Sequence, residues 1–119
     1  MSINPRLGTP LLEILRRARF ISEATAGVTY EQYAADPQLQ ALVERHLEVI
    51  GEAFRRISDA DEATADRLET AQGFIGLRNV IAHGYDRLVH QRIWDVVTGS
   101  LPSTIDQVSS LLEELGEPR

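Results

Sequence analysis

The sequence contains no cysteine and no lysine among its 119 residues. Without cysteine the chain has no disulfide, no thiolate metal site and no cysteine nucleophile, a composition that suits a reducing compartment. All 12 cationic side chains are arginines, which suit bidentate contacts with phosphates and stacking on bases. The net charge is nevertheless -6, so the overall field repels nucleic acid, and any binding of RNA must be local.

Long apolar runs are also missing. No stretch of about 18 apolar residues occurs, which excludes a transmembrane helix, and the segment from Met1 to Pro10 has no apolar region typical of a signal peptide. We therefore expect a cytoplasmic protein with no membrane association. A length of 119 residues predicts one domain, 1–119, large enough to bury a real core.

The chain shows no alternating strand pattern of useful length, and its apolar residues recur at helical spacing. Thr9-Pro10 is typical of a helix start, Gly27 offers a stop, and Asp36-Pro37 begins a second long helix. That second helix carries the clearest apolar stripe in the sequence, which consists of Leu39, Leu42, Val43, Leu47, Ile50, Phe54 and Ile57. Thr29 and Gln32 fit a capping box for a short helical turn between the two.

The second half of the chain predicts a polar turn with a short helix over 58–70 and then three further helices. The first of these ends near His83, where Gly84 offers a stop, and the second ends at Gly99. The last begins near Pro102 and runs through Leu115. The predicted fold class is all-α, an up-and-down bundle of four to five helices.

One segment has the residues for chemistry on a phosphodiester. Arg78, His83 and Tyr85 are spaced R-x-x-x-x-H-x-Y. A guanidinium can hold a phosphate, and an imidazole titrates near neutrality, so the pair suits RNA cleavage without a metal. Five residues on a helix turn through about 140°, so Arg78 and His83 do not share a strict face. The alternative is an arginine and a histidine solvated at a helix end.

Three separated blocks resemble the HepT-like family, the ribonuclease toxins of MntA-HepT systems in the HEPN superfamily. They are Leu47-Glu48-Val49-Ile50-Gly51-Glu52-Ala53, Gly76-Leu77-Arg78-Asn79-Val80-Ile81-Ala82-His83-Gly84-Tyr85, and Trp94-Asp95-Val96-Val97 leading into Leu101-Pro102. The resemblance covers most of the chain. It departs from the family at Thr70-Ala71, where many members carry a Pro-Trp pair, so we expect different packing at the start of that helix.

The resemblance implies a HEPN-like homodimer in which Arg78 and His83 of both subunits cleave RNA without a metal. The endoribonuclease reaction would leave a 2′,3′-cyclic phosphate, and Asn79 would support Arg78. Tyr85 would be adenylylated by a partner nucleotidyltransferase antitoxin, as in a type VII-like toxin-antitoxin system. The enzyme itself would need no cofactor, because ATP and Mg would belong to the antitoxin.

Glu52 is a further supporting candidate because it follows Gly51 inside a long helix. A glycine there costs helix propensity and indicates a close approach by another helix, so Glu52 could also be a dimer contact. Other arginines are candidate phosphate contacts or ordinary surface charge; they are Arg16, Arg17, Arg19, Arg55 and Arg56.

Three other kinds of site find little support in the sequence. Glu44, His46, Glu48 and Glu52 lack the Glu-x-x-His spacing of a metal site in a helical bundle, which favours a solvated helix face, and Asp59-x-Asp61 lacks the glycine and glutamate of a calcium loop. The sequence contains no nucleotide-binding loop and no cofactor fingerprint, so nothing in it indicates a small-molecule enzyme. The alternative function is a non-catalytic helical module that docks a nucleotidyltransferase.

Overall fold

A computed structural model describes residues 4–83 and 87–116 of the chain. Within these ranges every regular element is helical and none is a strand, so the predicted all-α fold class is confirmed. The elements are η1 (Pro5–Leu7), α1 (Gly8–Ala24), α2 (Tyr30–Ala34), α3 (Pro37–Ala60), α4 (Glu62–Asp66), α5 (Ala71–His83), α6 (Arg87–Asp95), η2 (Val96–Ser100) and α7 (Leu101–Leu115).

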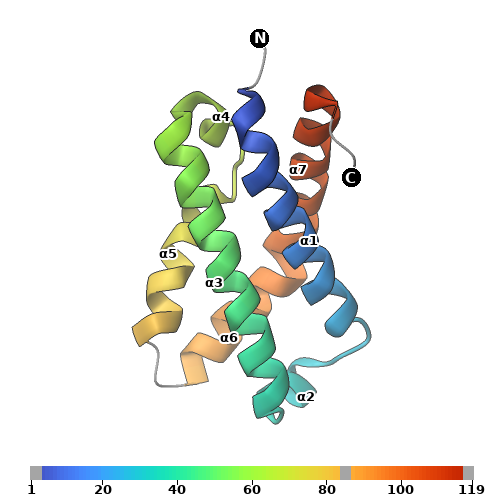
Figure 1. The fold of residues 1–119 in the computed structure, drawn as a ribbon. Helices are drawn as coiled ribbons and strands as arrows, with labels where there is room; N and C mark the ends of the chain where they lie inside the picture. Colours follow the sequence, from blue (N-terminus) through green and yellow to red (C-terminus); the bar gives the residue numbers. More distant parts are fainter. Residues whose placement is uncertain (1–3, 84–86, 117–119) are drawn as a thin grey trace.

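The long helices form a bundle with α3 at its centre (Figure 1). α3 packs most extensively against α5 and α1, and α7 packs against α1. The buried face of α3 consists of Val43, Leu47, Ile50, Gly51, Ala53, Phe54 and Ile57, most of the stripe that the sequence predicts. α2 and α6 contact each other at one end of the bundle (Figure 1). Both α5, which carries Arg78 and His83, and α6, which follows it, are therefore held by the rest of the bundle.

Two predicted helix starts are confirmed in detail. The Asp36 carboxylate accepts a hydrogen bond of 3.1 Å from the Leu39 amide, and Pro37 occupies the first turn of α3. At α2, the Thr29 hydroxyl accepts from the Gln32 amide at 3.1 Å, and the Gln32 side chain accepts from the Thr29 amide at 2.9 Å. This reciprocal pair satisfies two amides that the helix leaves free.

The predicted start of the first helix is wrong by a few residues. α1 begins at Gly8, with Leu7 in the N-cap position and no side-chain cap, so Thr9 and Pro10 lie inside the first turn. The reason is the preceding 3-10 turn, η1, whose chain continues directly into α1. Gly27 does follow the helix end, with a positive φ of 73°, a conformation that glycine adopts without a steric penalty.

The predicted break at Gly99 is also wrong. The chain passes from α6 into the π-helical turn η2, which contains Gly99, and then into α7. The flanking residues Asp95 and Leu101 keep right-handed helical dihedral angles. A wider turn therefore accommodates the glycine without ending the helix, and Pro102 stands in the first turn of α7.

The start of α5 is anchored to α7. The hydroxyl groups of Thr70 and Thr104 share a hydrogen bond, and Thr104 also donates to the Ser100 carbonyl at 2.9 Å. Ala71, the first residue of α5, is buried. A hydrogen bond between side chains thus holds the start of α5 against α7 at Thr70-Ala71, where the sequence departs from the family pattern.

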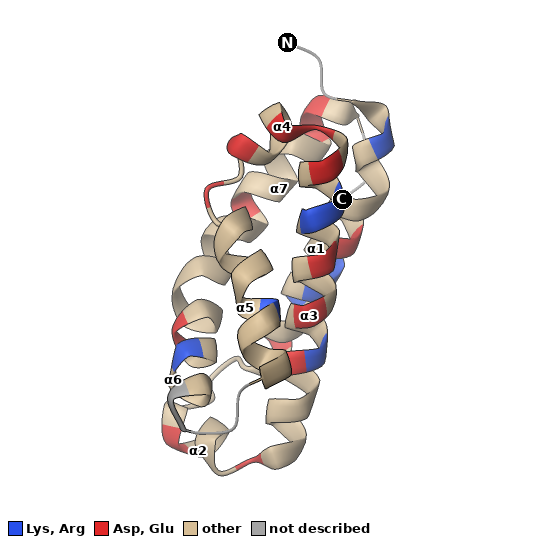
Figure 2. Cartoon of the chain, turned by 90° about the vertical axis from the view of Figure 1, so that its left-hand side faces the viewer, with Lys and Arg blue, Asp and Glu red and all other residues tan. Residues whose placement is uncertain are grey.

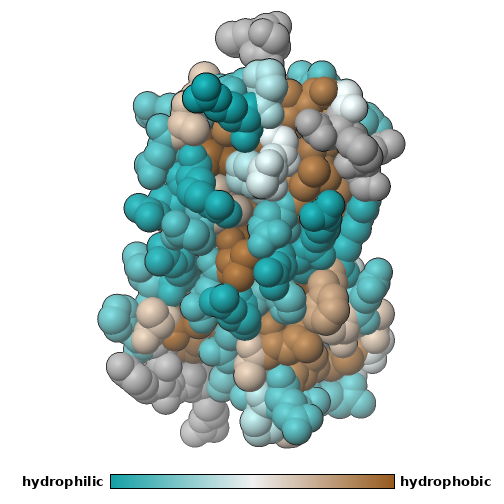
Figure 3. All heavy atoms as spheres, in the orientation of Figure 1, coloured by the Kyte–Doolittle hydropathy of each residue, from teal (hydrophilic) through white to brown (hydrophobic). Residues whose placement is uncertain are grey.

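The surface over α1 and α3 is mostly hydrophilic, with small hydrophobic patches between the polar side chains at both ends and near the middle (Figure 3). Phe20 is the one large hydrophobic side chain that is exposed in the described ranges. No helix in those ranges is long and apolar enough to cross a bilayer.

Candidate active site

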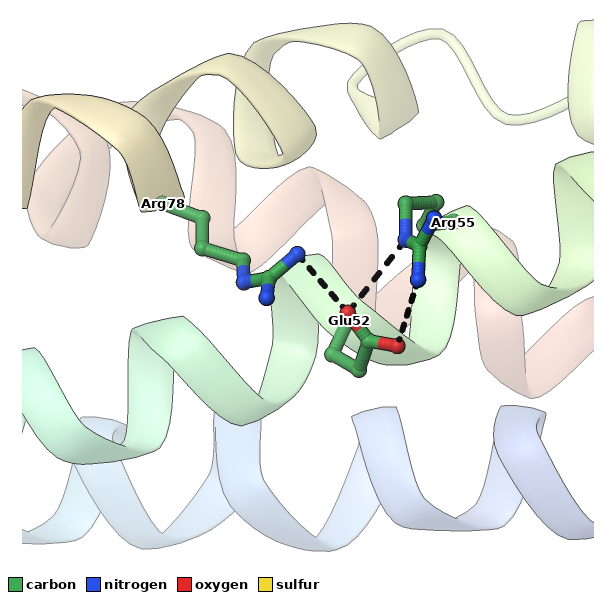
Figure 4. A network of polar contacts seen from close by, with 3 residues as sticks. All are labelled: Glu52, Arg55 and Arg78. Atoms are coloured by element: carbon green, nitrogen blue, oxygen red, sulfur yellow. Dashed lines mark hydrogen bonds and ion pairs between the residues drawn. The ribbon is translucent and has the colours of Figure 1, made fainter. Parts of the chain in front are cut away.

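Arg78 reaches from α5 across to α3. Its Nη1 atom lies 2.8 Å from Oε2 of Glu52, and Figure 4 shows the guanidinium directed at that carboxylate. The two side chains keep 42% and 35% of their surface exposed. Ion pairs this exposed contribute little to stability, so the main consequence of the pair is the position that it gives to the guanidinium.

Glu52 also binds Arg55, which lies on the same helix. The Arg55 Nη2 and Nε atoms donate to the two carboxylate oxygens at 3.2 and 3.4 Å, so Oε2 is shared between Arg55 and Arg78 (Figure 4). The hydrogen bond from Arg55, followed by the charges of the neighbouring arginines, lowers the pKa of Glu52. The carboxylate is therefore ionised at neutral pH and bridges two cations.

Gly51 explains how α5 comes close enough for this contact. A Cβ atom at Gly51 would lie 2.8 Å from the Phe74 carbonyl oxygen and 3.2 Å from Cβ of Arg78. Side chains do not pack this closely against a backbone. The close helix approach predicted from Gly51 is confirmed, and it brings the backbone of Arg78 beside α3.

A shallow pocket of about 240 Å³ surrounds the Arg78 side chain. Its lining consists of Arg45, Glu48, Val49, Glu52 and Arg56 from α3 and Arg78 from α5. Figure 2 shows this side of the molecule, where basic and acidic positions follow one another along α3 beside α5. Sequence reasoning did not single out Arg45, although its place seven residues before Glu52 puts both on one helix face.

His83 is the last residue of α5, and its side chain is exposed. No hydrogen bond or ion pair joins it to Arg78 in the described part of the chain, as expected from the turn of about 140° that separates them. Asn79 is exposed on α5, and the predicted modification site Tyr85 lies outside the described residues.

His46 and Glu52, two of the side chains that a metal site in the bundle would need, contact different partners. The Arg17 Nη1 atom lies 3.1 Å from Nδ1 of His46, and the Phe20 ring lies 4.6 Å from the imidazole between centroids. Glu52 instead faces Arg78. Among the residues that the structure describes, no group of three or more histidines and carboxylates is placed to hold a metal ion.

A second hollow of about 300 Å³ lies between the start of α5 and the α6–η2 segment. Phe74, Leu77 and Val96 supply its apolar lining, with Glu69 and Arg92 among the polar residues. It holds none of the predicted site residues. The smaller pocket is the better candidate site because it contains Arg78 and an ionised partner.

A family described as "Ribonuclease HepT-like" matches residues 14–111. "Putative RNase MJ0127" of Methanocaldococcus jannaschii is 28% identical over 105 residues, which are 88% of this chain and 86% of that protein. "Putative RNase TTE0752" of Caldanaerobacter subterraneus is 27% identical over 106 residues, 88% of this chain and 94% of its own length. No solved structure matches the chain.

Proposed function

Because this chain belongs to the ribonuclease HepT-like family, we propose that it is a metal-independent endoribonuclease toxin whose catalytic residues are Arg78 and His83. The family supports the ribonuclease class. The observation that carries the residue assignment is that Arg78 and His83 lie on one helix of the matched region, with Arg78 held in a solvent-open pocket.

The chemistry follows from the two side chains. The ribose 2′-oxygen attacks the adjacent phosphorus, a bond forms between them, and the bond from phosphorus to the 5′-oxygen breaks. His83 accepts the 2′-hydroxyl proton as general base, and the departing 5′-oxygen takes a proton from His83 of a second subunit or from water. Arg78 stabilises the charge on the phosphoryl oxygens in the transition state. The products are a 2′,3′-cyclic phosphate and a free 5′-hydroxyl.

The same proposal includes a homodimer and an antitoxin. In the dimer, two copies of α5 would bring both Arg78-His83 pairs to a shared cleft, with Asn79 supporting Arg78. A partner nucleotidyltransferase, using its own ATP and Mg, would adenylylate Tyr85. Because Tyr85 is two residues from His83, the added phosphate and nucleoside would repel RNA and block its access.

The test is cleavage of total cellular RNA in excess chelator, after an intact-mass measurement has shown that Tyr85 is unmodified. Wild type should cleave and leave cyclic phosphate ends, whereas His83→Ala should not. His46→Ala is the matched control, because it removes a histidine that contacts Arg17 and Phe20 on another face; it should cleave like wild type.

A second candidate function rests on the ion pair between Arg78 and Glu52. A paired arginine can serve structure alone, as it would in a non-catalytic module that docks a nucleotidyltransferase. Folded and unmodified wild type with no more activity than His83→Ala, together with a stable complex with the nucleotidyltransferase, would select this alternative.

A further inference from the structure

We propose that Arg45 and Arg56, one at each end of the Arg78 pocket, bind backbone phosphates of the RNA on either side of the phosphate held by Arg78. The inference rests on the proposed function for the identity of the ligand. It assigns to the RNA strand a path along α3, and the positions of Arg78 and His83 alone do not define such a path.

The geometry places both arginines on the face of α3 that carries Glu52. Positions 45, 49, 52 and 56 follow the helical spacing of three and four residues, and all four line the pocket. Arg45 and Arg56 are 11 residues apart, about 16 Å along the helix axis. Arg78 reaches this face between them, at Glu52. Three guanidinium groups thus mark a line long enough to meet several phosphates of one strand.

The charges around this line favour an anion. Three arginines, Arg45, Arg56 and Arg78, line the pocket with two glutamates, Glu48 and Glu52, although the whole chain carries a net charge of -6. The site is therefore a positive patch on a negative protein. An RNA strand that the overall field repels gains its attraction at such a local patch.

Arg45 and Arg56 are exposed, and neither forms an ion pair with a described carboxylate. Four of the other described arginines, Arg17, Arg55, Arg67 and Arg78, do form ion pairs. Arg67 pairs with Glu114 at 2.7 Å, and Arg17 pairs with Glu13 at 3.3 Å. A guanidinium without a carboxylate partner can bind a phosphate without first breaking a salt bridge.

The ligand that fits best is single-stranded RNA. The pocket is shallow and open, and Val49 is its one apolar lining residue, so it offers no deep slot for a base and no apolar surface to hold a protein partner. Contacts to phosphates require neither. An acidic segment of a partner protein is the competing occupant, and the experiment distinguishes it.

The experiment measures binding of a labelled single-stranded RNA at several salt concentrations, in the His83→Ala background so that the RNA stays intact. Each phosphate contact on a single strand contributes about 0.7 to the slope of log K against log salt. Arg45→Gln and Arg56→Gln should each lower the slope by about 0.7. Arg6→Gln is the matched control, because Arg6 is exposed on η1 and does not line the pocket; its slope should not change.

The outcomes separate the path from the proposed function. If wild type cleaves RNA and His83→Ala does not, but Arg45→Gln and Arg56→Gln keep the slope of the Arg6→Gln control, the proposed function stands and the path is wrong. If the two variants lose slope while wild type cleaves nothing, the path stands and the nuclease assignment is wrong. If they weaken only the complex with the nucleotidyltransferase, the pocket binds the acidic protein.

Discussion

Gly51 offers the sharpest test of how the site is built. Replacing Gly51 by alanine would place a Cβ atom 2.8 Å from the Phe74 carbonyl oxygen and 3.2 Å from Cβ of Arg78. The first contact is with the backbone of α5, which cannot rotate out of the way as a flexible side chain can. The variant must therefore push α5 away from α3.

The cost can be worked out from two opposing effects. Overpacking of this kind typically costs about 1–3 kcal/mol, whereas alanine in place of glycine stabilises a helix by up to about 1 kcal/mol. We expect Gly51→Ala to lower the free energy of unfolding by about 1 kcal/mol, taking the middle of the overpacking range. Gly73→Ala is the control, since a Cβ at Gly73 in α5 meets nothing within 4 Å; it should gain stability.

The assay is urea unfolding and a thermal melt of wild type and both variants at equal protein concentration. A difference of about 2 kcal/mol between the two variants corresponds to a Tm difference of about 8 °C for a chain of this length. RNA cleavage by Gly51→Ala should also fall, because Arg78 moves away from Glu52. Equal stability of Gly51→Ala and Gly73→Ala would refute the close approach of the two helices.

Three further predictions concern single side chains. Glu52→Gln should tighten RNA binding in the His83→Ala background, since a negative charge leaves the pocket. In the active enzyme it should slow cleavage, because Arg78 loses its ion pair. If RNA affinity and cleavage rate were both unchanged, the role given to Glu52 would be contradicted. Burial, followed by the charge of Arg17, lowers the pKa of His46, so the unfolded chain binds this proton more readily. The free energy of unfolding should fall as pH drops from about 6.5 toward that lower pKa, and the fall should be smaller in His46→Gln, as urea titrations at pH 5 to 8 would measure. The Tyr33 hydroxyl is buried without a hydrogen-bond partner in the described ranges, so Tyr33→Phe should raise stability by about 1 kcal/mol; a loss of stability in urea would show that the hydroxyl is satisfied.

Much of the fold could be predicted because its signals are local. Asp36-Pro37 predicts the start of α3 through one side-chain hydrogen bond, and Thr29 with Gln32 predicts α2 through two. The apolar spacing of α3 is equally local. The prediction that a helix ends at Gly99 failed because glycine commonly ends helices. No residue in the sequence signals that a π-helical turn continues the chain into α7.

The sequence indicated residues for the candidate site but not the contacts between them. The resemblance identified Arg78, and Gly51 indicated a close helix approach, which the structure has. The salt bridge from Arg78 to Glu52 joins residues 26 positions apart, and no spacing rule along one helix predicts such a contact. The same holds for Arg45, whose place in the pocket depends on where α5 crosses α3.

In the proposed mechanism, the position of His83 in the last turn of α5 would link activity to local and not to global unfolding. The last turn of a helix generally opens at a far lower free energy than the core does, so the fraction of molecules with His83 in place would depend on the opening of that turn. Substitutions that strengthen the core around α3 would then raise the melting temperature and leave this fraction as it was. On heating, cleavage should decline before the bundle unfolds, and the two temperatures would report two different equilibria.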